Sequence, residues 1–467
     1  MGPHSPRGPG SRTVRRDRLK LALAVVTAVL VLLGLGTFLA GFHAIALGIG
    51  DKYVLDLAGL ELPRKITYQL GMYVGLANLA LMPILLAGRR IVVAVGIPLL
   101  VAANVGLLAR WAGEAPGVLE RVPDQSRGDA RAFTEPPRLH LGPDDIRRLI
   151  DVRTPAKAEA RRRALIGAIW KRDALDLAAL PDRIETGLPR PDALRDSASL
   201  AGVERWSADL PHGFRAVLLR LRPARSIGRA MLYHHGHEGD AVAASRVLAN
   251  PLLDAGFDVV AIAMPGLAPN VAPDYLPTPR LGPLPNRFGH GGYRWMETES
   301  FSPLMLFLHP VLAAVNQLTR EGFERIDMAG LSGGGWTATV YAAVDPRIRK
   351  SFPVVGTLPL FLLGEPPNRM NMVDWEYTAP ALLRSANYLE MYALGSSGPG
   401  RRQIQIHNQF DGCCFRGVGA RLYAPLVAEA VSDLGQGGSY ELVILPEHGH
   451  RIAPEAVEII LREARAD

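Results

Sequence analysis

A serine flanked by glycines offers the most specific chemistry in this sequence. Ser332 lies in the pentapeptide Gly330-Leu331-Ser332-Gly333-Gly334, which has the pattern G-x-S-x-G. An apolar run at 325–329 precedes it, and a stretch with helical character follows at 336–344. A serine on so sharp a strand-to-helix turn sits in strained backbone that keeps its hydroxyl exposed, and the glycines avoid collisions with the adjoining strand and helix. The pattern predicts that Ser332 is a nucleophile and that the amide of Gly333 can donate to an oxyanion.

A serine hydroxyl needs a base to take its proton and an acid to orient that base. After a strand-turn-helix serine, the acid and then the histidine are expected on loops that follow later strands. Asp411 comes just after a predicted strand at 404–407, and His450 comes just after another predicted strand at 441–445. Asp411 also precedes a glycine, which is a common place for an aspartate that only shapes a turn. His448 competes with His450, but His450 is nearer the start of the next helix and is the predicted base, with His448 as a supporting residue of the loop.

A second oxyanion donor is expected in the loop after an earlier strand. The segment 233–240 contains His235-Gly236, which lets the backbone turn beneath the serine, and this makes the amide of His237 the expected donor. The same segment has a rival interpretation as a metal site, because histidines and carboxylates lie close in sequence. The ligands would be His235, His237, Glu238 and Asp240, completed by His448 and His450. That site would give the glycine-flanked serine no role. It also lacks the second Asp-His pair that binuclear metallohydrolases usually have close by in sequence. We therefore expect no metal and no cofactor.

Short apolar strands alternate with helices from about residue 213 to the C-terminus. This alternation predicts an α/β fold with a mostly parallel sheet covered by helices on both faces. Two longer stretches, 267–301 and 358–400, follow strands at the edge that carries the expected catalytic residues. They are predicted to form a cap over Ser332, and the sequence does not identify the residues that bind substrate.

Residues 213–467 resemble the α/β-hydrolase superfamily. The resemblance rests on the HHGH segment at 234–237, the glycine-flanked Ser332, Asp411 and His450, which occur in the family's order. It implies a mostly parallel eight-stranded sheet and a two-step acyl-transfer mechanism. Ser332 would attack the substrate, His450 would carry the proton, Asp411 would orient His450, and the amides of Gly333 and His237 would hold the oxyanion.

The N-terminal part of the chain predicts a membrane segment. A basic tail at 1–20, expected to be disordered, precedes three apolar stretches at 21–47, 66–88 and 91–108, each of which has the length and lack of charge of a transmembrane helix. Basic residues in the tail and at Arg89-Arg90 favour the cytoplasmic side, which would place the rest of the chain outside the cytoplasm. A partly helical linker is expected at 111–212.

The overall composition argues against one class of partner. The 467 residues carry a net charge of +7, but the basic residues form no stripe interleaved with aromatics, so a nucleic-acid partner is not expected. The two cysteines, Cys413 and Cys414, are adjacent and are expected to be packed thiols rather than a strained disulfide.

Together these features predict a membrane-anchored serine hydrolase that cleaves carboxylic esters. Its partners would be a small-molecule or envelope-associated ester and the lipid bilayer, and the sequence leaves its oligomeric state open. Three alternatives stay open: a serine peptidase of the same fold, a metal-dependent hydrolase, and a non-catalytic membrane scaffold.

Overall fold

The computed structural model describes residues 131–237, 241–286, 289–368 and 373–466, and also 32, 34–35, 38, 54–57, 60–63, 73 and 101–104. The chain divides into two compact units, Met1–Pro123 and Asp124–Asp467. In the first unit, β1 (Val54–Leu57) and β2 (Leu60–Pro63) form an antiparallel hairpin.

The three expected transmembrane helices, at 21–47, 66–88 and 91–108, lie outside the described residues except at a few isolated positions. In the part of the chain that the structure describes, no helix has both the length and the apolar character needed to cross a membrane.

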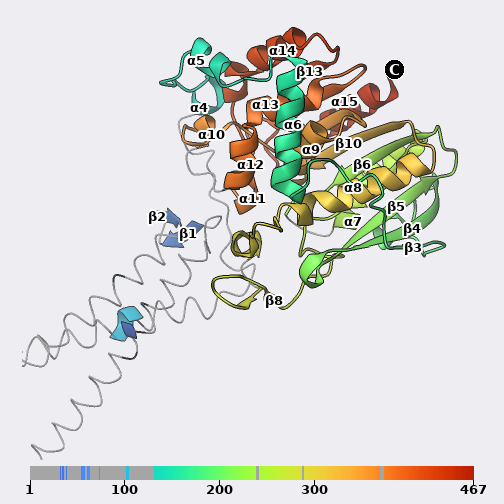
Figure 1. Cartoon of the computed structure of the whole chain (residues 1–467), viewed down its shortest axis with the longest axis horizontal. Helices are drawn as coiled ribbons and strands as arrows, with labels where there is room; N and C mark the ends of the chain where they lie inside the picture. Colours follow the sequence, from blue (N-terminus) through green and yellow to red (C-terminus); the bar gives the residue numbers. More distant parts are fainter. Residues whose placement is uncertain are drawn as a thin grey trace, which may run out of the picture. The chain divides into compact units, whose positions relative to one another are not determined.

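The second unit is built on one sheet, in which nine strands can be followed within the described residues (Figure 1). Their spatial order is β13-β12-β11-β10-β6-β7-β5-β4-β3. The six strands at the β13 end pair in parallel, and β5, β4 and β3 continue the sheet antiparallel. The strands are β3 (Arg183–Glu185), β4 (Leu200–Asp209), β5 (Arg215–Pro223), β6 (Arg229–His234), β7 (Asp258–Ile262), β10 (Arg325–Leu331), β11 (Ile348–Val354), β12 (Arg402–Asn408) and β13 (Ser439–Leu445). The mostly parallel α/β sheet expected from the sequence is therefore present.

Helices pack against this sheet in two groups, as expected for helices on opposite faces of a parallel sheet. Helix α7 (Ala241–Asp254) contacts α15 (Pro454–Arg465) and strands β5, β6 and β7. The second group contains α6 (Pro155–Trp170), α8 (Met305–Arg320), α9 (Gly333–Val344), α13 (Tyr388–Ser396) and α14 (Ala424–Asp433). Helices α6, α8 and α13 contact α9, and α14 contacts α13. Every residue of α9 is buried, because the helix lies between the sheet and its neighbours α6, α8 and α13.

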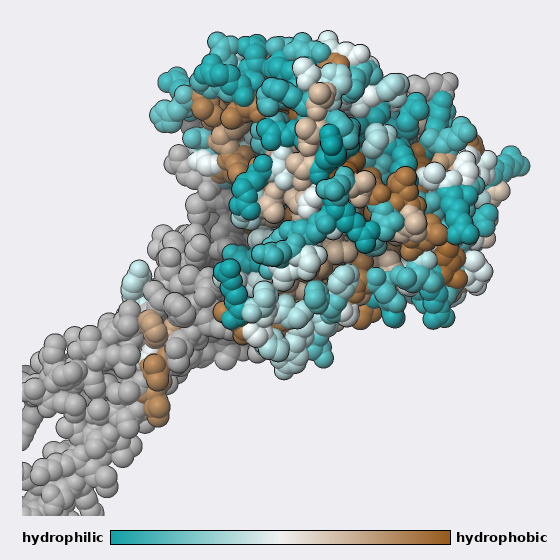
Figure 2. Space-filling model, viewed as in Figure 1, coloured by the Kyte–Doolittle hydropathy of each residue, from teal (hydrophilic) through white to brown (hydrophobic). Residues whose placement is uncertain are grey.

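The surface of this unit is mainly hydrophilic on the face shown, and its apolar side chains are mostly buried. On the face shown in Figure 2, hydrophilic residues predominate and apolar ones are scattered among them. The buried apolar side chains instead form a cluster that runs through the strands and both groups of helices.

The sheet begins earlier in the chain than the resemblance implied. Strands β3 and β4 lie within the expected linker at 111–212, and so does α6, which packs against α8, α9 and α12 (Pro380–Ser385). Strand β4 was not predicted because it contains Glu204, a charged residue that is nevertheless buried in the sheet. Glu204 accepts a hydrogen bond from Trp206 Nε1 at 3.0 Å and pairs with Arg220, which also binds Asp258 at 2.9 Å. A buried charge of this kind is tolerated because it is paired.

The two expected cap regions contain short strands and helices. The stretch 267–301 holds β8 (Tyr275–Leu276), β9 (Leu284–Pro285) and the 3₁₀ helix η4 (Gly289–Met296). The stretch 358–400 holds α10 (Leu360–Leu363), α11 (Trp375–Thr378), α12 and α13. Helix α13 is buried throughout and packs against α9 and α14, so this part of the second stretch belongs to the helical layer.

Candidate active site

Ser332 occupies a strained turn between β10 and α9. Its φ and ψ are 55° and −120°, a conformation that residues with a side chain rarely adopt. The turn is held because the amide of Ser332 donates to Val354 O at 2.9 Å. It also requires Gly334, since a Cβ built there would lie 1.9 Å from His234 O. This is the backbone strain that the glycine-flanked pattern predicted, and the half-buried Ser332 sits at the carboxyl end of the sheet.

The loop after β6 lies directly against this turn. A Cβ built on Gly236 would lie 2.9 Å from both Ser332 Cβ and Leu331 O, so only glycine fits there. The imidazole of His237 lies over Gly333, the residue after Ser332. A Cβ built on Gly333 would lie only 2.4 Å from His237 Cε1. The segment expected to supply the second oxyanion donor is therefore beside the serine.

Asp411 and His450 are in contact, as the expected acid and base should be. His450 Nδ1 lies 3.0 Å from Asp411 Oδ2 and 3.1 Å from Oδ1. Asp411 is fully buried, and its Oδ1 also accepts hydrogen bonds from the amides of Cys413 at 2.7 Å and Cys414 at 2.9 Å. The carboxylate is thus fixed in place and leaves one oxygen for the imidazole.

The loops that carry the acid and the histidine are joined to each other. Asn408 Nδ2 donates to the carbonyls of Gly449 at 2.8 Å and Arg451 at 2.9 Å, and the amide of Gly412 donates to His448 O at 3.1 Å. These loops follow β12 and β13, so they lie at the same edge of the parallel sheet as the turn after β10.

No hydrogen bond joins Ser332 Oγ to another described residue, and contacts of this kind often tighten only when substrate binds.

His448 lies apart from the acid. It is exposed, and its ring stacks on Phe410 with 4.7 Å between the ring centres. Of the two candidate histidines, the structure therefore places His450 against Asp411.

Cys413 and Cys414 form a disulfide, whereas two packed thiols were expected. Strain disfavours a bond between adjacent cysteines, but the two residues lie together in a turn that has a second role. The amides of both cysteines point at Asp411 Oδ1, so the turn that the disulfide closes is also the turn that holds the carboxylate.

A cluster of histidines and carboxylates beside the serine was not foreseen. His237 Nε2 lies 2.9 Å from Glu376 Oε1, 3.1 Å from Asp374 Oδ2 and 3.0 Å from His290 Nδ1. Although burial opposes both shifts, the neighbouring carboxylate raises the pKa of His290, and the two histidines hold the pKa of Glu376 well below its usual range. The sequence carried no local signal for this cluster, because its members come from three separate segments.

The alternative metal site of the sequence analysis is not assembled among the described residues. His235 Nδ1 lies 3.1 Å from Tyr233 OH, His448 stacks on Phe410, and His450 contacts Asp411. Glu238 and Asp240 lie outside the described residues.

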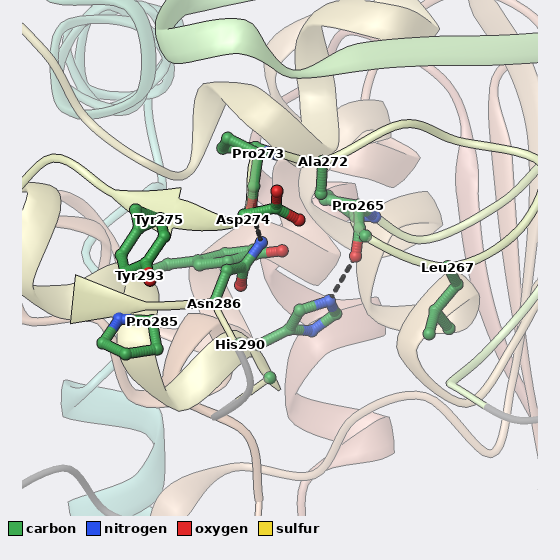
Figure 3. Close-up of a pocket in the computed structure, with 12 residues that line it drawn as sticks. Pro265, Leu267, Ala272, Pro273, Asp274, Tyr275, Pro285, Asn286, His290 and Tyr293 are labelled. Carbon is green, nitrogen blue, oxygen red and sulfur yellow. Dashed lines mark hydrogen bonds between the residues drawn. The ribbon is translucent and has the colours of Figure 1, made fainter. Parts of the chain in front are cut away.

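One cavity, of about 630 Å³, opens beside His290 (Figure 3). It is lined mainly by proline, glycine and tyrosine residues of the first cap region and of Pro265-Gly266 just before it, with Asp274 and Asn286 as polar groups. In Figure 3 the His290 ring points its Nε2 at Pro265 O, at 2.8 Å.

No protein-family model matches the chain, and no curated protein sequence matches it. Solved structures that are similar to part of this chain include an acetyl xylan esterase from a Thermoanaerobacterium species, at 14% identity and a TM-score of 0.45, covering 70% of this chain and 99% of that one. An acetyl xylan esterase from a Paenibacillus species has 15% identity and a TM-score of 0.44, covering 69% and 99%. A glucuronoyl esterase from Solibacter usitatus has 14% identity and a TM-score of 0.42, covering 65% and 91%.

Proposed function

We propose that this protein is a serine hydrolase that cleaves carboxylic esters through an acyl-enzyme intermediate. The observation that carries the proposal is the strained Ser332 turn at the same sheet edge as a buried Asp411 in contact with His450. Strain of this kind persists only where the surrounding structure enforces it, and it clusters at functional sites. A structural serine would not need glycines that allow two backbone segments to approach so closely.

The roles follow from the donors and acceptors. Asp411 accepts the Nδ1 proton of His450, so Nε2 is the ring nitrogen that takes the proton of Ser332. The hydroxyl oxygen then attacks the ester carbonyl, and the oxyanion accepts hydrogen bonds from the amides of Gly333 and His237. His450 returns the proton to the leaving alcohol. In the second half, His450 activates a water molecule that hydrolyses the acyl-enzyme.

A fluorophosphonate probe tests the nucleophile directly. The purified full-length chain should be labelled, and Ser332→Ala should not. Ala at His450 should also reduce labelling, because the base that activates the hydroxyl is lost. Equal labelling of wild type and Ser332→Ala would remove Ser332 as the nucleophile.

A substrate panel tests the reaction class. Aryl acetates and longer acyl esters should be hydrolysed faster than aminoacyl anilides. The reverse order would favour a peptidase, and a chain that neither binds the probe nor cleaves any substrate would favour a non-catalytic scaffold.

Membrane attachment is the second part of the proposal, and the apolar stretches of the sequence support it. A bilayer anchor at 21–108 would hold the catalytic unit outside the cytoplasm, near small-molecule or envelope-associated esters. A topology reporter fused at residue 112 should be active outside the cytoplasm. Activity on the cytoplasmic side would contradict this orientation.

A further inference from the structure

Four side chains from three segments converge beside the Ser332 turn. His237 follows β6, His290 lies in η4 of the first cap region, and Asp374 and Glu376 lie at the start of α11 in the second. Their ligand atoms, two imidazole nitrogens and two carboxylate oxygens, all lie within 4.8 Å of one another. Glu376 and His290 are buried, while His237 and Asp374 are partly exposed.

Protons alone do not satisfy this cluster. His237 Nε2 faces Glu376 Oε1, Asp374 Oδ2 and His290 Nδ1 at 2.9 to 3.1 Å, but a ring nitrogen carries at most one hydrogen. Two ring nitrogens 3.0 Å apart cannot both be protonated without bringing their hydrogens together. The second carboxylate oxygen of Glu376, Oε2, is buried and accepts no hydrogen bond from any residue that the structure describes. A buried carboxylate oxygen without a partner is costly, so it points to a cation.

His290 is oriented as a metal ligand. Its Nε2 lies 2.8 Å from the carbonyl of Pro265, an arrangement in which Nε2 carries the hydrogen and donates it. The lone pair of the neutral ring is then on Nδ1, which faces the cluster. Histidines that bind metals usually have the other ring nitrogen fixed by such a carbonyl or carboxylate.

We propose that His237, His290, Asp374 and Glu376 bind a divalent transition-metal ion, with Zn²⁺ as the preferred ion. Tetrahedral zinc with nitrogen and oxygen ligands at about 2.0–2.1 Å has neighbouring ligand atoms about 3.3 Å apart. The contacts of 2.9 to 3.3 Å within the cluster need only small side-chain movements to reach that spacing. Imidazole nitrogens favour zinc over Ca²⁺ and Mg²⁺, which prefer shells made only of oxygen.

The ion would connect both cap regions to the loop after β6, which lies against the Ser332 turn. His237 is the link, because its ring lies over Gly333, the residue after Ser332. Fixing that ring fixes the loop whose amide is the second oxyanion donor, so the four ligands act as positioning residues in a role that rests on the proposed function. Metal binding itself does not rest on it.

Metal content and metal affinity test the site. The full-length chain should be purified without added metal and analysed for bound metals, then stripped with a chelator and titrated with Zn²⁺ by calorimetry. We expect about one zinc per chain and a higher melting temperature with zinc. Glu376→Gln and Asp374→Asn should each weaken zinc binding by at least tenfold. Because Glu376 is buried and its variant could misfold, the partly exposed Asp374 provides the second, milder change.

Two controls make the result specific. His448→Ala removes an exposed histidine outside the cluster and should leave zinc affinity unchanged. Ser332→Ala should also bind zinc like the wild type, so loss of the proposed esterase activity and loss of the metal site can be told apart. Absence of zinc together with no thermal shift in excess Zn²⁺ would overturn the proposal. So would equal zinc affinity in the wild type and Asp374→Asn, or a preference for Ca²⁺ over Zn²⁺.

Discussion

Replacing Asp411 by asparagine tests the acid-base pair with almost no change in shape. Asp411 Oδ1 accepts two amide hydrogen bonds, from Cys413 and Cys414, so the carbonyl oxygen of an asparagine would take that place. The asparagine NH₂ would then face His450 Nδ1 at about 3.0 Å, where the carboxylate oxygen had been. Because NH₂ donates, Nδ1 must accept, the ring proton moves to Nε2, and His450 can no longer take a proton from the serine.

The size of the effect follows from the cost of escaping this arrangement. Flipping the asparagine would restore an acceptor for His450 but would leave the two amides of the turn without one. Each buried donor left unsatisfied costs about 1–3 kcal/mol, so the flip costs about 2–6 kcal/mol. At about 1.4 kcal/mol per tenfold, kcat for Asp411→Asn should fall by about 30-fold to about 2 × 10⁴-fold.

The assay is steady-state hydrolysis of an aryl ester, with circular dichroism to show that the variant is folded. Asp173→Asn is the matched control, because Asp173 is an exposed carboxylate outside the site, and its kcat should be unchanged. A folded Asp411→Asn protein that keeps its kcat within about fivefold of the wild type would refute the role given to Asp411.

Three further changes have defined outcomes. Gly334→Ala places a Cβ 1.9 Å from His234 O, so the turn must shift, and we expect about 1–3 kcal/mol of lost stability in denaturant titration together with loss of probe labelling. Burial raises the pKa of Asp327 to about 7, above its unfolded value, so this group destabilises the fold as pH rises from about 4 to 7. Asp327→Asn should therefore gain stability over the wild type across that range, by at most about 4 kcal/mol, and a difference that does not change with pH would contradict the shift. Replacing Cys413 and Cys414 together by serine frees the turn that holds the carboxylate, so kcat should fall about tenfold or less with KM nearly unchanged; an unchanged kcat would show that the turn holds without the disulfide.

The sequence predicted the elements that carry local signals. The glycine-flanked Ser332, the strands before it and before Asp411 and His450, and the helices after them are short-range patterns of burial and turn chemistry. Each of these elements is present in the structure. The preference for His450 over His448 agrees with the contact to Asp411.

The features that the sequence analysis missed depend on contacts between distant residues. From the sequence alone, Glu204 is expected on the surface because it is charged. Its pairing with Arg220 and its hydrogen bond from Trp206 Nε1 explain why this charged segment is a buried strand. Likewise, nothing near Glu376 in the sequence indicates that His290 lies beside it, since 85 residues separate them and the pairing depends on how the two cap regions fold.

Trapping the acyl-enzyme tests the central claim most directly. The full-length chain would be mixed with an excess of an activated ester, quenched in acid within milliseconds, digested and analysed by mass spectrometry. We predict that the acyl group is found on the peptide containing Ser332, and on Ser332 itself after fragmentation. Rapid ester turnover with no acyl group on Ser332, or with the group on another residue, would contradict the account.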